Sequence, residues 1–306
     1  MYIHKLGIFF RKKPRCMIWK IYGEQFSLEK WGDPAMLKIS VITVSYNAAA
    51  TIEQTILSVV GQMYPHIEYI VIDGGSTDGT VDIIRKYEDQ IAYWVSEPDA
   101  GMYDALAKGF TRATGDVCAY INADDFYQPH AFATVCQIFQ DTGCQWLTGI
   151  NAVYNSCGQI VDVKIPFCYR VEFIQKGFYN GTILPFIQQE STFWDMRLLQ
   201  YVDFMCLRKM KLAGDSYLWK CFSEHTKLHI VRCILSGFRK RRGQLSEAGD
   251  AYRQELNRFC AGRPNWIEKI QIFFDRIKGG FPVRFNPNII CFDFEEGSWQ
   301  EHGHKR

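Results

Sequence analysis

Short apolar runs alternate with helix-length amphipathic segments between Lys38 and residue 127, and this alternation restricts the fold more than any other feature. Strands that alternate with helices of this length form a mainly parallel sheet with helices on its faces. The sequence therefore predicts an α/β fold for this part of the chain. The expected strands are 38–45, 67–73, 91–97 and 116–122, and the expected helices are 49–62, 76–87 and 102–114.

Beyond residue 128 the pattern changes. A helix (HAFATVCQIFQ) is expected first, and two hairpin strands (CQWLTGINAVYN and GQIVDVKIPF) follow it. Residues 195–210 and 214–224 have helical patterns, and 227–238 has the pattern of a strand. Residues 247–278 read as two basic helices that are interrupted near Gly262–Pro264. In the first half of the chain, Ser76 or Thr77 is the expected cap of the helix at 76–87.

Polar side chains follow each of the four expected parallel strands. Because ligands gather at the carboxyl ends of the strands in open sheets of this kind, these side chains are expected to form one site. The residues at the four strand ends are Thr43, Ser45, Tyr46 and Asn47; Asp73, Gly74 and Gly75; Glu97, Asp99 and Gly101; and Asn122, Asp124 and Asp125.

Two adjacent acids, Asp124 and Asp125, end the fourth strand, and no Lys or Arg lies within ten residues of them. Neighbouring carboxylates repel each other, so that one takes up a proton or both bind a cation. A few oxygen ligands without His or Cys suit Mg2+ or Mn2+. The alternative is a solvated acidic turn that caps the following helix.

The net charge of +2 is unevenly distributed along the chain. Residues 1–38 hold 8 basic and 3 acidic side chains, residues 39–224 hold 12 and 21, and residues 225–306 hold 15 and 9. The acidic central part argues against a nucleic-acid groove, whereas the basic flanks suit an anionic membrane surface or acidic ligands. Basic faces that are merely solvated are the alternative.

The 11 cysteines form no CxxC pair and no cluster at zinc-ligand spacing, which indicates reduced, buried thiols in a cytosolic protein. Apolar runs in residues 1–23 are interrupted by basic residues and are too short for a signal peptide or a membrane span. This segment is either an amphipathic anchor on a membrane surface or an extension packed on the domain.

Residues 39–127 resemble the donor-binding half of inverting family 2 glycosyltransferases, which have the GT-A fold. The pieces that carry the resemblance are ISVITVSYNAAATIEQTILSVVGQ, IEYIVIDGGSTDGT, SEPDAGMYDALAKG and ATGDVCAYINADD. A second match, to the bacterial polysaccharide and lipopolysaccharide branch, lies in QQESTFW, AGDSYLW and LSGFRKRRGQLS. Together these pieces cover most of residues 39–246. The resemblance implies a Rossmann-like, mainly parallel sheet with a C-terminal helical extension.

The resemblance also implies roles for the strand-end residues. Asp125 is expected to bind the divalent ion that bridges the donor diphosphate, and Asp124 to contact the ribose or assist the metal. Asp73 matches the first acid of the family's usual pair; Gly74 replaces the second, so that Asp73 is expected to share its part in base recognition. The other expected nucleotide or sugar contacts are Thr43, Ser45, Tyr46 and Asp99.

Inversion by direct displacement needs a general base that takes the proton of the acceptor hydroxyl. The resemblance assigns this role to Asp215, at the start of a helix in AGDSYLW. Glu190, in QQESTFW, is the rival, or the two act together. An N-cap role for Asp215 is the alternative. Trp194 and Trp219 are expected either to stack on a sugar ring or to belong to the core.

The resulting hypothesis divides the chain into three parts. Residues 1–37 are a basic amphipathic extension, 38–225 a catalytic domain with a donor half (38–127) and an acceptor half (128–225), and 226–306 a basic extension that faces a membrane or the acceptor. The expected activity is transfer of a sugar from a nucleotide-sugar, a UDP-sugar, to a hydroxyl of a lipid-linked acceptor in bacterial cell-surface polysaccharide synthesis. The protein is expected to be cytoplasmic and peripheral on the inner face of the cell membrane.

Two other classes of protein remain open. A sugar nucleotidyltransferase also uses an α/β sheet and paired acids, but it would need a Gly-rich loop with Arg and Lys near the first strand. The segment VSYNAAATIE has neither feature. The second class is a non-catalytic glycan-binding or scaffold protein that keeps a relic nucleotide site.

Overall fold

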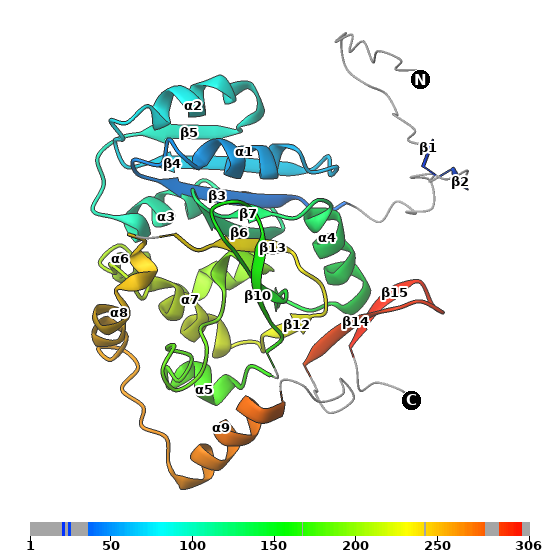
Figure 1. The fold of residues 1–306 in the computed structure, drawn as a ribbon, viewed down its shortest axis with the longest axis vertical. Helices are drawn as coiled ribbons and strands as arrows, with labels where there is room; N and C mark the ends of the chain where they lie inside the picture. Colours follow the sequence, from blue (N-terminus) through cyan, green and yellow to red (C-terminus); the bar gives the residue numbers. More distant parts are fainter. Residues whose placement is uncertain are drawn as a thin grey trace. The chain divides into compact units, whose positions relative to one another are not determined.

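The computed structural model describes residues 36–166, 168–241, 243–278 and 288–301, together with the backbone of two short strands, β1 (Lys20–Ile21) and β2 (Glu24–Gln25), which pair antiparallel. From Leu37 onward the chain forms one compact unit (Figure 1). Most of the predicted N-terminal extension, 1–37, lies outside the described residues, and so does the membrane contact predicted for it.

The main sheet has the strand order β15-β14-β12-β8-β11-β6-β3-β4-β5. Its parallel part contains β3 (Ile39–Ser45), β4 (Ile67–Asp73), β5 (Tyr93–Ser96) and β6 (Val117–Asn122), which confirms the predicted strands. Next to β6 lies β11 (Thr192–Asp195), which runs antiparallel to both β6 and β8 (Trp146–Thr148). The sheet continues through β12 (His229–Val231), β14 (Ile289–Asp293) and β15 (Ser298–Glu301).

Helices cover both faces of the main sheet. Successive side chains of a strand point to opposite faces, and in β3 Ile39 and Val41 belong to one apolar core whereas Ile42 and Val44 belong to the other. The first core packs against α1 (Ile52–Val60), α2 (Thr80–Lys86) and α4 (Ala131–Thr142). The second core packs against α3 (Met102–Phe110), α5 (Val171–Gln175) and α7 (Gly214–Ser223). Burial on both faces explains why the strands read as continuous apolar runs.

A smaller sheet has the order β10-β9-β13-β7. The predicted hairpin is present as β9 (Asn151–Tyr154) and β10 (Ile160–Lys164), which pair antiparallel. The single strand predicted over 144–155 is wrong, because its first part forms β8 of the main sheet and only its second part forms β9. The single strand predicted over 227–238 is wrong, because the chain leaves the main sheet after β12 and enters the smaller one as β13 (Ser236–Arg239). There β13 pairs with β7 (Phe126–Tyr127), the strand that directly follows the two acids.

The remaining helical segments are mostly short. The helix predicted over 195–210 is instead the end of β11, a 3-10 segment η4 (Met196–Tyr201) and α6 (Phe204–Leu207). Two helices, α8 (Gly249–Leu256) and α9 (Trp266–Lys278), confirm the pair predicted at 247–278. Three further 3-10 segments are η2 (Glu88–Gln90), η3 (Gln189–Ser191) and η5 (Leu245–Glu247). In the part of the chain that the structure describes, no helix has the length and apolar character needed to span a bilayer.

The predicted cap of α2 is also wrong. The helix begins at Thr80, with Gly79 before it at a φ of 96°, and Ser76 lies outside the helix. Ser76 instead donates its hydroxyl to Asp73 and accepts a hydrogen bond from the Asn47 amide. Ser76, which the local spacing had assigned to the helix, therefore belongs to the loop after β4.

Both tryptophans that could have stacked on a sugar belong to the core. Trp194 is 0% exposed and Trp219 is 1% exposed, and their ring centroids lie 5.8 Å apart. The core interpretation is therefore confirmed. Buried thiols such as Cys118 and Cys136 pack in the same cores.

Glu68 connects the parallel strands at their amino-terminal edge. Its carboxylate accepts hydrogen bonds from Lys38 Nζ (2.6 Å), Ser40 Oγ (2.6 Å), and the Thr114 amide and hydroxyl (2.6 Å each). Burial by itself would raise the pKa of Glu68, but these hydrogen bonds lower it to about 2. The ionised form of Glu68 therefore stabilises the folded state.

We expect Glu68→Gln to lower the free energy of unfolding at pH 7 by about 1–3 kcal/mol, the range for hydrogen bonds to a charged group. Because the folded-state pKa lies below the ordinary value of 4.5, this stabilisation is complete above pH 4.5 and disappears as the pH falls towards 2. Urea unfolding at several pH values, with the exposed Glu88→Gln as the control, measures the difference. A deficit that stays constant down to pH 2 would contradict the assignment.

Candidate active site

Four parallel strands end side by side at one edge of the main sheet, as predicted. Asp73 at the end of β4 pairs in register with Ser96 of β5 and with Ser45 of β3, and Val44 pairs with Asn122 of β6. Because β11 runs antiparallel to β6, its beginning lies at this same edge. The preceding segment η3 therefore brings Glu190 to the ends of the parallel strands.

Asp73 is buried and organises the strand ends. Its carboxylate accepts hydrogen bonds from the hydroxyls of Ser45 (2.8 Å), Ser76 (2.5 Å) and Ser96 (2.6 Å) and from the amides of Gly75 (3.1 Å) and Ser76 (2.8 Å). Burial opposes ionisation, but these donors lower the pKa of Asp73. With 0% exposure and five donors, Asp73 holds the loop together and has no oxygen turned to open space.

The other nucleotide-contacting residues expected on β3 have different surroundings. Thr43 is 0% exposed and accepts a hydrogen bond from the Tyr69 hydroxyl at 3.0 Å, so that its side chain faces the core. Ser45 is buried and donates to Asp73. Tyr46 is 68% exposed, and of these three it alone presents its side chain to solvent.

The loops after β3 and β4 are joined by hydrogen bonds that the sequence analysis missed. Asn47, at a left-handed φ of 48°, accepts from the Thr77 amide at 3.0 Å. The Ala49 amide donates to Asp78 at 3.0 Å, and the Ala48 amide donates to the hydroxyl of the helix residue Thr80. These hydrogen bonds connect the two loops beside the strand ends. The sequence feature that could have indicated them is the pair of polar segments YN and STDGT, which follow neighbouring strands.

Asp99 lies against the glycine that replaces the family's second acid. A Cβ atom at Gly74 would be 2.8 Å from Asp99 Oδ2, so that only a glycine lets the two loops approach this closely. The other oxygen, Oδ1, accepts from the Gly101 amide at 2.7 Å. Asp99 is partly exposed, and it lies beside Gly74, just after the end of β4.

Asp125 is 0% exposed, and one of its two carboxylate oxygens has no partner. Oδ1 accepts a hydrogen bond from the Arg239 amide of β13 at 2.9 Å, whereas Oδ2 is buried without any hydrogen bond. Burial raises the pKa of Asp125, and the carboxylates of Glu190 and Asp124 raise it further. A buried carboxylate oxygen of this kind requires a proton or a cation.

Asp124 is partly exposed, and its side-chain partners, Arg241 and Gln244, lie far away in the sequence. Its Oδ2 lies 3.1 Å from Arg241 Nη2 and accepts a hydrogen bond from Gln244 Nε2 at 2.8 Å. Both partners come from the segment after β13, which reaches the acids because β13 pairs with β7. The basic run FRKRRG was visible in the sequence, but its partner could be identified only once this strand pairing was known.

Glu190 and Asp215, the two candidate bases, differ in how far burial raises their pKa. Glu190 is 2% exposed with an unpartnered Oε1, and burial, followed by the charges of Asp124 and Asp215, raises its pKa to about 8. The Asp215 side chain keeps some exposed area, but desolvation of its carboxylate raises the pKa to about 6. Two donors act against this rise: the Ser216 amide (2.7 Å) and the Tyr252 hydroxyl (2.9 Å). Burial therefore favours the protonated form of Glu190 more strongly than that of Asp215.

The acids fit a cation that is shared with a substrate. Within the described ranges, no three His, Cys, Asp or Glu side chains form a ready-made metal site. The unpartnered Oδ2 of Asp125 and the adjacent Asp124 offer a small set of hard oxygen ligands. Mg2+ and Mn2+ accept such a set when water and phosphate oxygens complete the shell.

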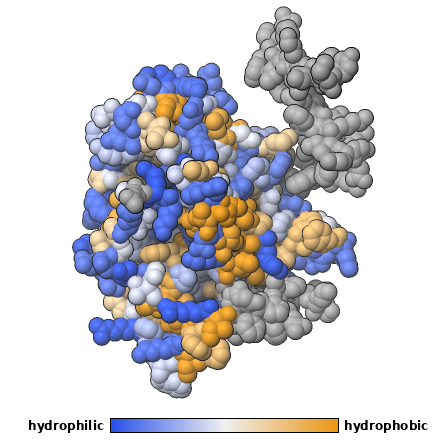
Figure 2. Space-filling model, in the orientation of Figure 1, coloured by the Kyte–Doolittle hydropathy of each residue, from blue (hydrophilic) through white to orange (hydrophobic). Residues whose placement is uncertain are grey.

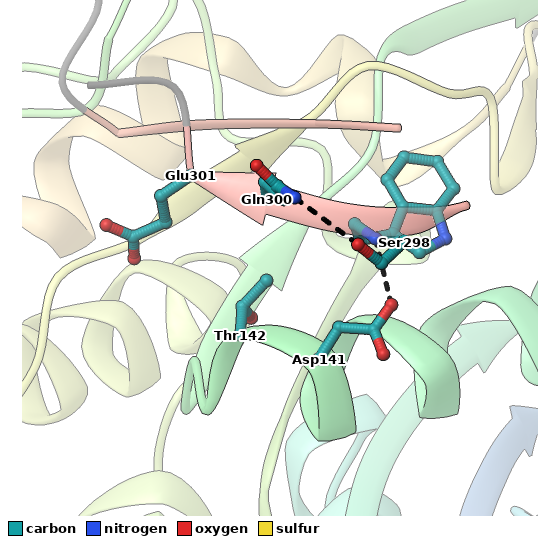
Figure 3. A pocket seen from close by; sticks show the side chains of 6 residues that line it. Asp141, Thr142, Ser298, Gln300 and Glu301 are labelled. Carbon is teal, nitrogen blue, oxygen red and sulfur yellow. Dashed lines mark hydrogen bonds between the residues drawn. The ribbon is translucent and has the colours of Figure 1, made fainter. Parts of the chain in front are cut away.

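A separate pocket of about 540 Å³ lies between the end of α4 and β15 (Figure 3). The Trp299 amide donates to Asp141 at 2.8 Å across it, and Glu301 and Thr142 line its other side. None of the site residues predicted from the sequence lines this pocket.

A mainly parallel sheet that is covered by helices and carries acids at its carboxyl edge defines the GT-A class of folds. Solved structures of this class superpose on the chain. The S. aureus TarS fragment 1–349 in complex with UDP-GlcNAc matches with a TM-score of 0.58 and 16% identity, over 80% of this chain and 73% of that one. The mannosyltransferase PcManGT of Pyrobaculum calidifontis, in complex with GDP-Man and Mn2+, matches with a TM-score of 0.55 and 16% identity, over 84% and 76% of the two chains.

The chain belongs to Glycosyl transferase family 2, whose model matches residues 40–199. An uncharacterised glycosyltransferase of Mycobacterium tuberculosis is 41% identical over 34% of this chain and 41% of its own length. TuaG of Bacillus subtilis, named as a teichuronic acid biosynthesis glycosyltransferase, is 37% identical over 50% of this chain and 63% of its own. The chain thus spans less than two thirds of the length of these relatives.

We expect Arg241→Ala to strengthen the binding of Mn2+ in the absence of nucleotide, because Asp124 then loses a competing cation. An ion pair at this level of exposure is worth about 0.2–1 kcal/mol, which corresponds to a gain of about 1.4-fold to fivefold. Titration followed by electron paramagnetic resonance measures the free Mn2+. Lys240→Ala, which removes an exposed cation from the same segment, is the control. Unchanged or weaker binding in Arg241→Ala would refute competition.

Proposed function

We propose that the chain is a metal-dependent inverting glycosyltransferase that moves a sugar from a nucleotide-sugar, a UDP-sugar, to a hydroxyl of a glycan acceptor. The observation that carries this proposal is the unpartnered, buried Oδ2 of Asp125, next to Asp124, at the carboxyl ends of the parallel strands. Membership of Glycosyl transferase family 2 and the nucleotide-sugars named with the structural neighbours support it.

Asp125 and Asp124 would hold the divalent cation, Mg2+ or Mn2+. When bound, the cation offsets the negative charge that grows on the diphosphate as the glycosidic bond breaks. Arg241, within 3.1 Å of Asp124, offers a second positive charge at this position. The exposed Tyr46 and the partly exposed Asp99 are proposed to contact the base, ribose or sugar, whereas Asp73 and Ser45 order the loop beneath them.

The difference in pKa between the two candidate bases favours Asp215. A general base must be unprotonated, and at pH 7 a carboxyl with a pKa of about 6 is ionised whereas one with a pKa of about 8 is not. We therefore assign Asp215 to accept the proton of the acceptor hydroxyl as its oxygen attacks the anomeric carbon. The bond from that carbon to the diphosphate breaks, and the nucleoside diphosphate leaves. Glu190, which keeps its proton, is assigned to donate a hydrogen bond to the acceptor.

The acceptor is proposed to be lipid-linked, in the synthesis of a bacterial cell-surface polysaccharide at the inner face of the membrane. The name of the relative TuaG supports a cell-surface polymer, and the basic C-terminal part supports an anionic surface. In this assignment residues 38–127 bind the donor and 128–225 the acceptor. Residues 226–306 add strands to both sheets and supply Arg241.

We expect Asp125→Asn to lower sugar transfer and UDP release at least 100-fold. Asn keeps an acceptor for the Arg239 amide, so that the fold survives while the charged ligand is lost. A panel of UDP-sugars with Mn2+ or Mg2+, read as nucleotide release, measures the effect. The exposed Asp89→Asn is the control. Turnover of Asp125→Asn at the level of this control would rule out the metal assignment.

The dependence of kcat/KM on pH tests the base. We expect kcat/KM to rise with pH through an apparent pKa of about 6, because Asp215 acts only when it is ionised. The Tyr252 hydroxyl lowers this pKa, so that Tyr252→Phe should shift the rise to higher pH. Tyr217→Phe, whose hydroxyl contacts the Asp203 carbonyl instead, should leave the profile unchanged. An identical profile for wild type and Tyr252→Phe would argue against Asp215.

A further inference from the structure

Helix α9 presents six of its seven apolar side chains to solvent, whereas the seventh, Ile272, is buried in the core. The six are about half exposed or more, which is unusual for a helix that packs on a globular protein. They are Trp266 (71%), Ile267 (49%), Ile270 (48%), Phe273 (59%), Phe274 (48%) and Ile277 (51%). At about 100° per residue these positions span an arc of roughly 120° on one side of the helix. The exposed apolar face of α9, defined by these six residues, is therefore continuous.

The polar side of α9 holds it to the body. Asp275 is 8% exposed and forms a two-pronged ion pair with Arg170 (2.7 and 2.9 Å). Glu268 is 8% exposed and pairs with Lys176. Arg276 adds hydrogen bonds to the Thr182 and Ile183 carbonyls. These contacts fix the rotation of the helix, so that its apolar face must point away from the protein.

The start of the helix is fixed in the same way. The Asn265 amide donates to Glu268 at 2.8 Å, and the Glu268 amide donates to the Asn265 side chain at 2.9 Å. This reciprocal cap sets the first turn of α9. Trp266, the most exposed of the apolar residues, follows the cap directly and lies at the end of the apolar face.

The charge that remains on α9 is positive. Both acidic residues of the helix are neutralised by Arg170 and Lys176 from the body, whereas Lys269 and Arg276 are exposed beside the apolar arc. Arg258 and Arg263, just before the helix, are exposed as well. An apolar stripe flanked by cations and ended by a tryptophan complements the interface of an anionic lipid bilayer.

A second apolar surface lies on the same side of the molecule. Figure 2 shows hydrophobic surface over β10 and again over α9, both turned to the viewer. The β10 surface consists of Ile160, Val161 and Val163, which are 47–56% exposed, and of Ile165 just after the strand (39%). Strand β10 is one edge of the smaller sheet, in which Arg239 of β13 donates its amide to Asp125. The face that carries α9 thus also carries an edge of the sheet that contacts the acidic site.

We propose that α9 lies flat in the headgroup region of an anionic bilayer, with its apolar face inserted and Lys269 on the lipid phosphates. A second copy of the chain fits less well, because two identical faces packed together would oppose their own cations. This inference deepens the proposed function, on whose membrane location it rests: it names the surface that meets the membrane, and it does not depend on the reaction.

Flotation of the full-length protein with vesicles tests the proposal. We expect binding to vesicles that contain phosphatidylglycerol and at least tenfold weaker binding to pure phosphatidylcholine. The double substitution Ile270→Glu and Phe273→Glu should lower the partition coefficient on the anionic vesicles at least tenfold. Both side chains are about half exposed or more, so the fold tolerates the change. Met63→Glu, which adds a charge at another exposed apolar residue, is the matched control and should bind like wild type.

Three results would overturn the proposal. The first is wild-type protein that does not float with the anionic vesicles. The second is equal flotation of the double variant and wild type. This outcome includes the case in which vesicle binding is lost only when residues 1–35 are deleted. The third is a wild-type dimer in light scattering that becomes monomeric in the double variant. Nucleotide release without acceptor, measured on the same proteins, reports on the proposed transferase activity independently of vesicle binding.

Discussion

The hydrogen bond from the Arg239 amide to Asp125 connects the two sheets at the point where the acidic site forms. It attaches the end of β6 to β13, and it fixes one carboxylate oxygen while the other stays unpartnered. Thr55 of α1 adds a second link by donating its hydroxyl to the Asp125 carbonyl at 2.6 Å. A buried carboxylate is unfavourable unless hydrogen bonds or a cation compensate its charge, and in Asp125 only one of the two oxygens has a hydrogen-bond donor. The site is ready for a ligand because the fold itself does not satisfy this oxygen.

The rest of the site divides into fixed and available parts. Asp73 and the loops after β3 and β4 satisfy one another through hydrogen bonds, so that they form a support that binding need not reorganise. The pairs of Asp124 with Arg241 and Gln244 lie nearer to solvent and can exchange partners. The preorganised loops around Asp73 lower the cost of positioning a ligand, and the exchangeable partners of Asp124 leave it able to bind one.

Local pattern was sufficient for the parallel strands, because burial on both faces leaves an unmistakable apolar run, and for the convergence of their ends, because parallel strands share one carboxyl edge. It failed where a residue's role is decided by distant partners. Ser76 accepts a hydrogen bond from the Asn47 amide, 29 positions away, instead of capping a helix, and residues 227–238 divide between two sheets. The pairing of Arg241 with Asp124 depends on a strand register that no local signal encodes. Tyr46 and Thr43 belong to the same segment, and the sequence assigns both to the nucleotide, but only Tyr46 is exposed to solvent.

The site also has a consequence for the order of synthesis. Asp124 and Arg241 are 117 positions apart, and the partner amide of Asp125 lies 114 positions after it. A nascent chain on the ribosome can therefore complete the parallel strands while its paired acids still lack every basic neighbour. Such long-range closure is slow relative to local helix formation. Until β13 emerges, the smaller sheet lacks the strand that lies between β9 and β7, so that we expect this corner of the protein to be among the last parts to become ordered.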